Sequence, residues 1–465
     1  MTLLAPKIAA ARAVGELARR AGRGGGTSLP GKVLLALEPD AIPELAARLP
    51  RGSVVISATN GKTTTAAMVA SVLARAGISV VHNRAGANMA GGVASTLLAA
   101  ARPGRRIHGD LGLFELDEFW LDRVAPQLHP RGILLGNLFR DQLDRYGELD
   151  TIADRWAAVA VAGAHDARLI LNADDPLIAD LGRDTPNVTY FGLEDPSVAI
   201  PEMQHASDSK HCRRCGAAYV YDVVYLGHLG RYRCPVCGRE RPAPSVTAER
   251  IELHGTLRSG FELATPAGRA RVELPLPGLY NVYNALGAAA LCLSLGVALD
   301  VVVSGLGDVQ AAFGRAERMV IGDVEVQMLL VKNPAGANEI LRTLVLEPHE
   351  LDLLAILNDR TADGRDVSWV WDADFEMLAG RVRRVTCAGS RAAELAVRLK
   401  YAGVPVDRLH VVPGVAAALD EAAAQTGSGR LYVLPTYTAL LELRGLLAER
   451  GQAVPFWEPA GVRRP

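Results

Sequence analysis

The chain has 465 residues, 49% of them hydrophobic and 22% charged, and its net charge is −1. A chain of this length exceeds one ordinary hydrophobic core, so two or three domains are expected. The balance of 50 basic against 51 acidic residues gives no overall bias towards nucleic acid. No uninterrupted apolar run reaches the roughly 20 residues that span a bilayer.

The N-terminal segment predicts an amphipathic helix that ends at a glycine-rich linker. Arg12, Glu16 and Arg19 lie within its apolar part, whereas a secretory signal places its charge ahead of an apolar run. Four of the six cysteines form two C-x-x-C pairs. This pattern indicates a metal site in a reducing compartment rather than disulfide bonds. We therefore expect a cytoplasmic protein.

From residue 54 onward, β-rich runs alternate with stretches rich in Ala and Leu that have helical spacing. Strands alternating with helices indicate a parallel, doubly wound sheet. The expected strand and helix pairs are 53–57 with 63–76, 78–83 with 91–101, 111–116 with 117–124, 132–137 with 150–163, and 167–175 with 176–182.

The alternation stops at residues 205–242, which are rich in His, Cys, Arg and Tyr. A β-like stretch at 245–275 and a helix at 281–296 follow. Near residue 320 the alternation begins again and predicts a second, smaller α/β domain. The expected divisions are an N-terminal helical segment and linker (1–50), a central ATP-binding domain (51–316) and a C-terminal domain (317–465).

The segment ISATNGKTTTAAMVASVLARAG (56–77) predicts a phosphate-binding loop, although the first glycine of the usual G-x-x-x-x-G-K-[ST] pattern is absent. An apolar strand leads into a turn of small residues, whose N–H groups can approach phosphate oxygens. The helix that follows adds the positive end of its dipole. Lys62 is placed to reach the β- and γ-phosphates, and Thr63 or Thr64 can hold magnesium. Ala58, at the position of the usual glycine, is small enough to leave the loop open.

Four further motifs follow the loop in order: FELDEFW (114–120), GNLFRDQLDRYGELD (136–150), GLYNVYNALGAAAL (278–291) and GRAERM (314–319). Together with SATNGKTTT they resemble the Mur ligase superfamily. The resemblance implies an α/β fold with a central Mur-ligase-type P-loop ATPase domain and a smaller, Rossmann-like C-terminal α/β domain. It also implies ATP and Mg²⁺ as cofactors.

The resemblance assigns roles to individual residues. Glu115 matches the magnesium-site glutamate, with Thr63 as the second magnesium ligand, but Asp117 and Glu118 compete for that role. Lys62 and Glu115 would take part in catalysis. The residues of the loop that would bind ATP are Thr59, Asn60, Gly61, Lys62, Thr63 and Thr64.

The later motifs add two contacts to the nucleotide. By resemblance, Asn284 contacts adenine and Arg315 is directed at phosphate. Asn281, three residues before Asn284, is interpreted as a helix cap. Gln142 stands where the amino-acid-adding members usually carry His, so the role of that residue does not transfer.

Two features distinguish this sequence from the soluble Mur ligases and indicate a particular branch of the superfamily. Only about 50 residues precede the loop, which leaves no room for the domain that grips UDP in soluble Mur ligases. The cysteine pairs, LLVKNPAGANEIL (329–341) and NDRTADGRDVSWVWDADFE (358–376) are similar to the MurT family of lipid II isoglutaminyl synthase subunits. This implies a heterodimer with a GatD-type glutaminase and lipid II as the substrate at the inner face of the membrane. The implied reaction is ATP-dependent amidation of the α-carboxylate of D-isoglutamate in the stem peptide.

The implied chemistry suits these residues. Transfer of the γ-phosphoryl group makes an acyl phosphate, while Lys62, magnesium and an arginine such as Arg315 neutralise charge. The nucleophile is ammonia, which at neutral pH is mostly unreactive ammonium, so direct delivery from an attached glutaminase avoids that loss. No nucleophile elbow surrounds Cys292 or Cys387, and Cys292 is interpreted as a core residue. The chain therefore needs a partner.

The stretch TADGRDVSWVWDADFE (361–376) of the C-terminal domain has four aspartates interleaved with Trp369 and Trp371. By resemblance this region meets the glutaminase, and one aspartate completes the Cys–His pair of the partner, since an aspartate can orient an imidazolium across an interface. Asp366 is preferred over Asp363 and counted as catalytic. The alternative is that these residues cap turns beside a strand. The other two candidates are Asp372 and Asp374.

The pairs CRRC (212–215) and CPVC (234–237) are separated by 18 residues. This spacing predicts a structural zinc ribbon ligated by Cys212, Cys215, Cys234 and Cys237. The insert is also rich in arginine. Nucleic-acid binding is one interpretation, but scaffolding, or contact with the anionic pyrophosphate of lipid II through residues such as Arg213 and Arg214, suits an insert in an ATPase domain better.

Two other functions are compatible with part of these motifs. One is a ligase that adds an amino acid, as Mur and folylpolyglutamate ligases do. Gln142 and the missing UDP domain argue against a ligase of the Mur type. The zinc insert argues against both the Mur and the folylpolyglutamate types. The other is a zinc-ribbon binding protein that uses ATP only as a conformational switch. The intact set of adenine, phosphate and magnesium motifs argues against this.

Overall fold

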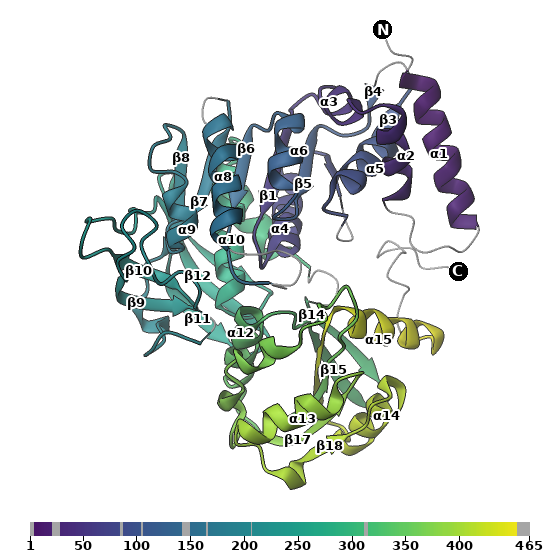
Figure 1. Cartoon of the computed structure of the whole chain (residues 1–465), viewed down its shortest axis with the longest axis vertical. Helices are drawn as coiled ribbons and strands as arrows, with labels where there is room; N and C mark the ends of the chain where they lie inside the picture. Colours follow the sequence, from purple (N-terminus) through teal and green to yellow (C-terminus); the bar gives the residue numbers. More distant parts are fainter. Residues whose placement is uncertain are drawn as a thin grey trace.

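The computed structural model describes residues 4–20, 28–83, 87–103, 106–141, 149–163, 166–205, 207–310 and 315–452. The chain forms a large central domain and a smaller C-terminal domain, each built on one main sheet (Figure 1). The expected alternation of strands and helices is confirmed in both. Among the described residues, no helix combines the length and the apolar character needed to cross a membrane.

The central sheet has nine strands in the order β13-β12-β11-β8-β7-β6-β1-β5-β2. The pairs from β2 to β11 are parallel, and β12 and β13 extend the sheet in antiparallel fashion. The strand β1 is buried on both faces, which explains the apolar residues VVI at its centre, and the hydroxyls of Ser53 and Ser57 at its ends donate to backbone carbonyls. The strands are β1 (Ser53–Ser57), β2 (Val80–His82), β5 (Leu111–Glu115), β6 (Gly132–Leu135), β7 (Arg168–Asn172), β8 (Val188–Leu193), β11 (Val246–His254), β12 (Arg258–Thr265) and β13 (Gly268–Leu274).

Helices cover both faces of this sheet and form two separate cores. One core contains residues of α4 (Lys62–Arg75), α10 (Leu279–Ser294) and α11 (Leu299–Gly307). The other contains residues of α5 (Ala90–Ala100), α6 (Leu121–Leu128) and α8 (Leu149–Gly163). The short helix α9 (Pro176–Asp180) follows β7, and β3 (Ala101–Arg102) pairs with β4 (Arg106–Ile107) outside the main sheet.

The N-terminal helices belong to the second core. They are α1 (Leu4–Arg20), α2 (Leu29–Leu37) and α3 (Ala41–Ala46), and Leu34 and Ile42 are buried in the same cluster as Phe114. A Cβ atom on Gly31 would lie 1.9 Å from the carbonyl oxygen of Gly91, so only glycine permits this approach of α2 to α5. The N-terminal helices are therefore packed on the central sheet.

One helix begins later than the sequence pattern indicates. A helix was expected at 117–124, but α6 starts at Leu121. The preceding residues form a turn in which the Trp120 N–H donates to the Asp117 carbonyl at 2.9 Å and the Phe119 N–H to the Asp117 carboxylate at 3.1 Å. Acidic side chains in this turn compete with helical hydrogen bonds, so the segment remains a loop at the end of β5.

The insert forms a hairpin of β9 (Val220–Leu226) and β10 (Leu229–Arg233), which Figure 1 shows at the edge of the central domain nearest α12. The 3₁₀ turn η1 (Pro196–Val198) precedes it. The tip of the hairpin points inward, because Leu226 and Leu229 are buried in the first core.

The C-terminal sheet has six strands in the order β14-β15-β19-β16-β17-β18, and all neighbours except β14 and β15 are parallel. Helices α12 (Pro334–Leu344) and α13 (Ala392–Tyr401) cover one face, and α14 (Val415–Thr426) and α15 (Tyr437–Glu449) the other. The strands and short turns are β14 (Arg315–Ile321), β15 (Val324–Leu329), β16 (Leu351–Ile356), β17 (Val382–Ala388), β18 (Leu409–Val411), β19 (Arg430–Pro435), η2 (Ser368–Trp371), η3 (Phe375–Leu378) and η4 (Val406–Arg408).

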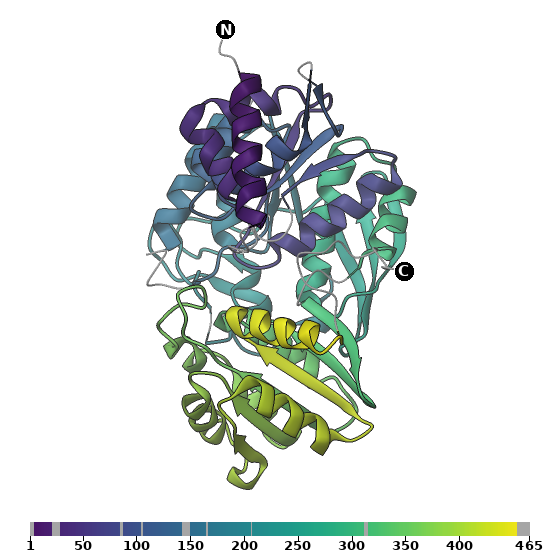
Figure 2. The same ribbon diagram turned by 90° about the vertical axis from the view of Figure 1, so that its right-hand side faces the viewer.

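The two domains are in direct contact (Figure 2). The Thr256 N–H and hydroxyl both donate to Glu347 at 2.7 Å. The Thr256 carbonyl accepts from Arg318 at 2.7 Å and from Gln327 at 2.9 Å. These bonds hold the C-terminal domain against the turn that joins β11 and β12 at the end of the central sheet.

Candidate functional site

The loop between β1 and α4 has the conformation that its sequence predicts. Gly61 precedes the first turn of α4 with φ +90°, in the left-handed region that favours glycine. A Cβ atom here would lie 2.1 Å from Oδ1 of Asn284, so glycine is also needed for the approach of α10. Asn137 supports the loop by accepting from the Asn60 N–H at 2.9 Å and donating to the Asn60 carbonyl at 2.9 Å.

Lys62 lies in the first turn of α4, where it is only 8% exposed. Its Nζ donates to Glu118 at 2.7 Å and to the carbonyl of Ala58. The hydroxyl of Thr63 donates to Glu115 at 3.1 Å. The structure therefore assigns different neighbours to the two glutamates: Glu118 pairs with the lysine, and Glu115 with the threonine.

Burial and charge act in opposite directions on these groups. Burial alone would lower the pKa of Lys62, but Glu118 and its acidic neighbours outweigh it and raise that pKa above its usual value. Burial would likewise raise the pKa of Glu118, yet Lys62 and Lys332 leave it lowered. Burial and the nearby Glu118 raise the pKa of Asp117. Lys62 and Glu118 therefore form a buried ion pair at the loop.

The structure brings most of the predicted nucleotide residues together. Besides the loop, Asn284 lies in α10, where its Oδ1 accepts from Thr65 at 3.2 Å and its amide donates to Asn281 at 3.1 Å. The interpretation of Asn281 as a helix cap is wrong, because α10 begins at Leu279. Asn281 instead donates from within the first turn to the carbonyl of Pro277 at 2.7 Å.

The side-chain positions of two predicted site residues lie outside the described part of the structure. Arg315 is the first residue of β14 and its backbone pairs with Leu329, but its side chain lies outside the described part of the structure. Gln142 lies outside the described residues altogether. Their predicted roles stay predictions.

The C-terminal domain contributes residues for which no individual role was predicted. Asn333 caps α12 by accepting from the Gly336 N–H at 2.8 Å, and its amide donates to Asn60 at 3.0 Å. Lys332 forms an ion pair with Asp141. The Asn-Pro pair predicts a helix start, but nothing local to it indicates contact with a loop 273 residues away.

A cavity lies where these elements meet. Its walls come from the phosphate loop, α10, the hairpin tip and the C-terminal domain. Because the hairpin supplies part of the wall, the cysteine insert lies next to the candidate nucleotide site. The lining residues include Asn60, Gly61, Asn137, Leu226, Leu229, Tyr280, Asn284, Lys332, Glu339 and Ile340.

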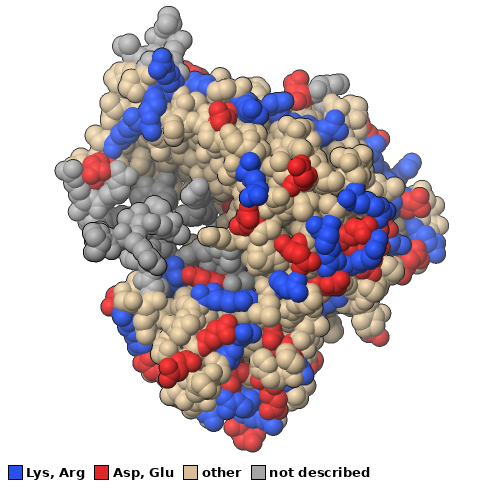
Figure 3. Space-filling view, turned by 180° about the vertical axis from the view of Figure 1, so that it is seen from behind, with Lys and Arg blue, Asp and Glu red and all other residues tan. Residues whose placement is uncertain are grey.

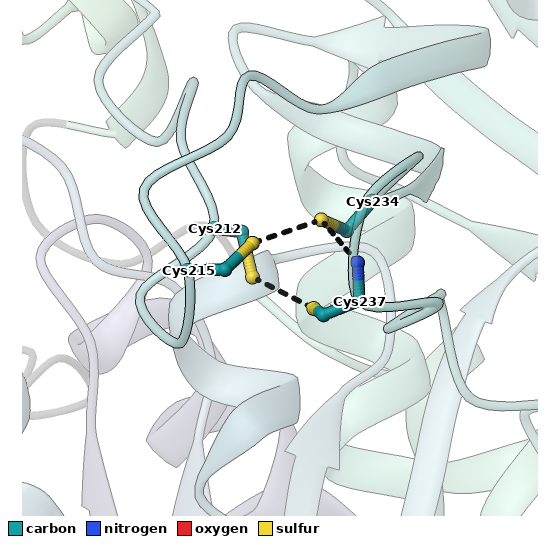
Figure 4. Close-up of side chains that lie close together, drawn as sticks. All are labelled: Cys212, Cys215, Cys234 and Cys237. Atoms are coloured by element: carbon teal, nitrogen blue, oxygen red, sulfur yellow. Dashed lines mark hydrogen bonds between the residues drawn. The ribbon is translucent and has the colours of Figure 1, made fainter.

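The four cysteines of the insert converge (Figure 4). Their sulfur atoms all lie within 4.8 Å of one another, with 3.4 Å between Cys215 and Cys234 and 3.6 Å between Cys212 and Cys237. The backbone N–H groups of Cys237 and Val236 lower the pKa of Cys234 to about 6. Four convergent sulfurs, with N–H groups that favour a thiolate, fit tetrahedral zinc.

The arginines of the insert are largely neutralised. On the face shown in Figure 3, positive and negative side chains are interspersed. Interaction of the insert with an anionic substrate would have to compete with these internal pairs. The ion pairs are Arg213 with Asp150 and Asp154, Arg231 with Glu194, Arg233 with Asp222, Arg239 with Asp180, and Arg241 with Asp174 and Glu194.

The four candidate aspartates of the C-terminal domain have different environments. Asp363 is buried and accepts from the N–H and hydroxyl of Thr438 at the start of α15. Asp374 bonds Asn338 at 2.6 Å and His205 of the insert at 2.8 Å. Asp372 lies 3.8 Å from Arg140. Asp366 is exposed and accepts from the N–H of Ser368 at 2.8 Å, which lowers its pKa.

Solved structures identify the class of fold. A pseudomurein peptide ligase type C from Methanothermus fervidus superposes with a TM-score of 0.66 at 23% identity, covering 87% of this chain and 80% of its own. MurF ligase from Thermotoga maritima in complex with ADP has a TM-score of 0.63 at 13% identity, covering 90% and 84%. The fold is therefore that of the Mur ligases: a large, mostly parallel sheet with a separate C-terminal α/β domain.

Sequence comparison narrows the class. A model of the Mur ligase middle domain matches residues 56–292, and one of the MurT ligase C-terminal region matches residues 330–440. The MurT subunit of the glutamine-hydrolyzing lipid II isoglutaminyl synthase of Streptococcus pneumoniae is 33% identical and that of Staphylococcus aureus N315 31% identical. The alignments cover 92% and 91% of this chain and 93% and 94% of those proteins. The chain belongs to the MurT family and is an ATP-dependent ligase.

Proposed function

We propose that this chain is the synthetase subunit that amidates the α-carboxylate of D-isoglutamate in the stem peptide of lipid II, forming D-isoglutamine. The observation that carries the proposal is the similarity to two lipid II isoglutaminyl synthase subunits over both domains. The buried lysine and acidic residues beside the phosphate loop support it, because carboxylate activation by ATP requires charge neutralisation at that point. The proposed domain limits are 1–50, 51–316 and 317–465.

The reaction has two steps. In the first, a carboxylate oxygen of the substrate attacks the γ-phosphorus of ATP, which gives an acyl phosphate and ADP. In the second, ammonia attacks the carbonyl carbon, the tetrahedral intermediate expels phosphate, and the nitrogen loses one proton. The ammonia comes from hydrolysis of glutamine to glutamate in a GatD-type partner.

The residues of the loop hold the nucleotide in this proposal. Lys62 contacts the β- and γ-phosphates, Asn284 contacts adenine and Arg315 phosphate. Glu115 and Thr63 hold magnesium, since their oxygens are already 3.1 Å apart and this ion prefers few carboxylates together with phosphate and water. The ion would neutralise charge on the phosphates when bound.

Asp366 is the residue that we propose completes the glutaminase site of the partner. It is exposed and its lowered pKa keeps it ionised, which an aspartate that orients an imidazolium requires. Trp371, 52% exposed, lies nearby in sequence with its ring 6.0 Å from that of exposed Tyr401. An exposed aromatic pair beside a carboxylate suits a protein interface.

We also propose that the reaction takes place at the cytoplasmic face of the membrane, where lipid II is anchored.

We further propose that a structural zinc ion is held by Cys212, Cys215, Cys234 and Cys237. Metal analysis of the purified chain tests the zinc site. One zinc per chain, lost in a Cys212→Ser and Cys215→Ser double variant, is expected. A chain that purifies folded without metal would contradict it.

The assay that tests the function uses the chain co-purified with its glutaminase partner, with ATP, glutamine and lipid II. Mass spectrometry of the product is expected to show replacement of one hydroxyl by an amino group. A gain of a whole amino-acid residue would instead identify the alternative, an amino-acid-adding ligase of the Mur or folylpolyglutamate type. Unchanged lipid II would contradict both.

A further inference from the structure

One buried carboxyl group in the nucleotide cavity has unused hydrogen-bonding capacity. Glu339 lies on α12, lines the cavity and is only 3% exposed, and its Oε1 has no hydrogen-bond partner among the described residues. Arg342 is 4.0 Å away, but its guanidinium donates to the carbonyls of Tyr225 and Val198. A buried acceptor without a partner costs about 1–3 kcal/mol.

The other polar side chains of the cavity are engaged. The amide of Asn137 bonds the backbone of Asn60, and that of Asn284 bonds Thr65 and Asn281. Lys332 is paired with Asp141. Each of these groups, including Asn284, already has partners within the chain, whereas Oε1 of Glu339 has no hydrogen-bond partner among the described residues, so a ligand that meets Glu339 should present a hydrogen-bond donor.

The surrounding wall indicates the kind of ligand. Leu226 and Leu229 of the hairpin tip, Tyr280 of α10 and Ile340 of α12 form apolar surfaces. The phosphate loop lines the same cavity, so a nucleotide with its phosphates at the loop would place its base among these residues. An aromatic base fits apolar walls, and its exocyclic amino group supplies the donor.

We propose that the carboxyl group of Glu339 accepts a hydrogen bond from the 6-amino group of adenine. Glu339 thereby acts as a specificity-determining residue that the C-terminal domain contributes to the ATP site. The inference rests on the proposed function, in that ATP must occupy this cavity. Because the phosphate loop belongs to the central domain, a nucleotide bound in this way would bridge the two domains and favour their contact.

The test compares ATP with the triphosphate of purine riboside, which differs only in lacking the 6-amino group. Equilibrium binding of both nucleotides is measured by calorimetry on the full chain co-purified with its partner. The unmodified chain is expected to bind ATP roughly five- to tenfold more tightly, the effect of one buried hydrogen bond. In Glu339→Met this preference should fall below about twofold, whereas Glu339→Gln, which retains an acceptor, should keep it.

Glu347→Gln is the matched control, because it alters a buried carboxylate just beyond the end of α12 that does not line the cavity. It should retain the preference for ATP. Equal affinity of the unmodified chain for the two nucleotides, or an undiminished preference in Glu339→Met, would overturn the inference and leave the proposed function intact. Failure of both nucleotides to bind would contradict the ATP site itself. If Glu339→Met is unstable, Glu339→Leu takes its place, because the preference of the unmodified chain alone does not separate Glu339 from Asn284, which we propose also contacts adenine.

Discussion

The acidic residues of the central domain and those of the C-terminal domain are arranged differently. In the central domain, Glu115 and Glu118 are buried beside Thr63 and Lys62. In the C-terminal domain, Asp366 is exposed and Glu339 is buried with an oxygen that has no hydrogen bond among the described residues. The phosphate end of the site is therefore organised by pairs within the chain, whereas Asp366 and Glu339 are the two C-terminal acids for which we propose a partner and a ligand.

Removing the central lysine should have the largest effect. Lys62→Met is expected to lower the rate of amidation about 10³-fold, as loss of a buried group that stabilises transition-state charge does. It also leaves Glu118 buried without its cation, which should lower the free energy of unfolding by about 3 kcal/mol. Rates are measured at saturating ATP, and stability by denaturant unfolding.

The double variant Lys62→Met with Glu118→Gln separates these two effects. Removing both charges should recover most of the stability but none of the activity. Recovery of activity together with stability would show that Lys62 only stabilises the folded chain. It would contradict a role of Lys62 in neutralising charge at the phosphate end of the site.

The C-terminal domain offers a second test through pH. Burial raises the pKa of Glu339 from 4.5 to about 7. Below pH 4.5 the carboxyl is protonated in both the folded and unfolded states, so it has no net effect. As pH rises towards 7 the unfolded state ionises first, so the folded state loses relative stability, up to about 3 kcal/mol above pH 7.

Glu339→Gln should abolish that loss. Its free energy of unfolding relative to the unmodified chain should therefore increase between pH 4.5 and pH 8, measured by urea unfolding at each pH. Glu347→Gln serves again as the control and should show no such gain, because Thr256 and Arg430 hold the pKa of Glu347 below its usual value despite burial. A difference that is flat with pH would contradict the burial of an ionisable Glu339.

The exposed aspartate should affect only the glutamine-dependent activity. Asp366→Asn is expected to slow glutamine hydrolysis in the complex about 10²-fold or more, because an amide cannot stabilise the imidazolium of the partner. Amidation supplied with ammonium salts at high pH should be retained. Unchanged glutamine hydrolysis would remove Asp366 from this role.

Asp363→Asn is the matched substitution at a buried neighbour. It weakens the acceptor for the N–H and hydroxyl of Thr438 at the start of α15, so the free energy of unfolding should fall by about 1–2 kcal/mol. Glutamine hydrolysis per folded complex should change little. If Asp363→Asn instead slowed glutamine hydrolysis and Asp366→Asn lowered only the stability, the proposed roles of the two aspartates would be exchanged.

The sequence predicted the elements and the loop because their signals are local. The strand, small-residue turn and helix of residues 53–76 follow from neighbouring side chains, and only glycine suits the positive φ at position 61. The two C-x-x-C pairs likewise indicated one metal site, and their sulfurs converge. Family membership followed from ordered motifs of this kind.

What the sequence could not determine is which groups meet across long separations. Only the tertiary structure pairs Lys62 with Glu118 and Thr63 with Glu115, separates buried Asp363 from exposed Asp366, and brings Glu339 into a cavity with the phosphate loop. Local spacing governs backbone conformation, whereas burial and charge pairing depend on the packing of two domains and an insert. The motifs along the chain therefore predicted the type of chemistry, whereas the pairing of individual side chains was established only by the tertiary structure.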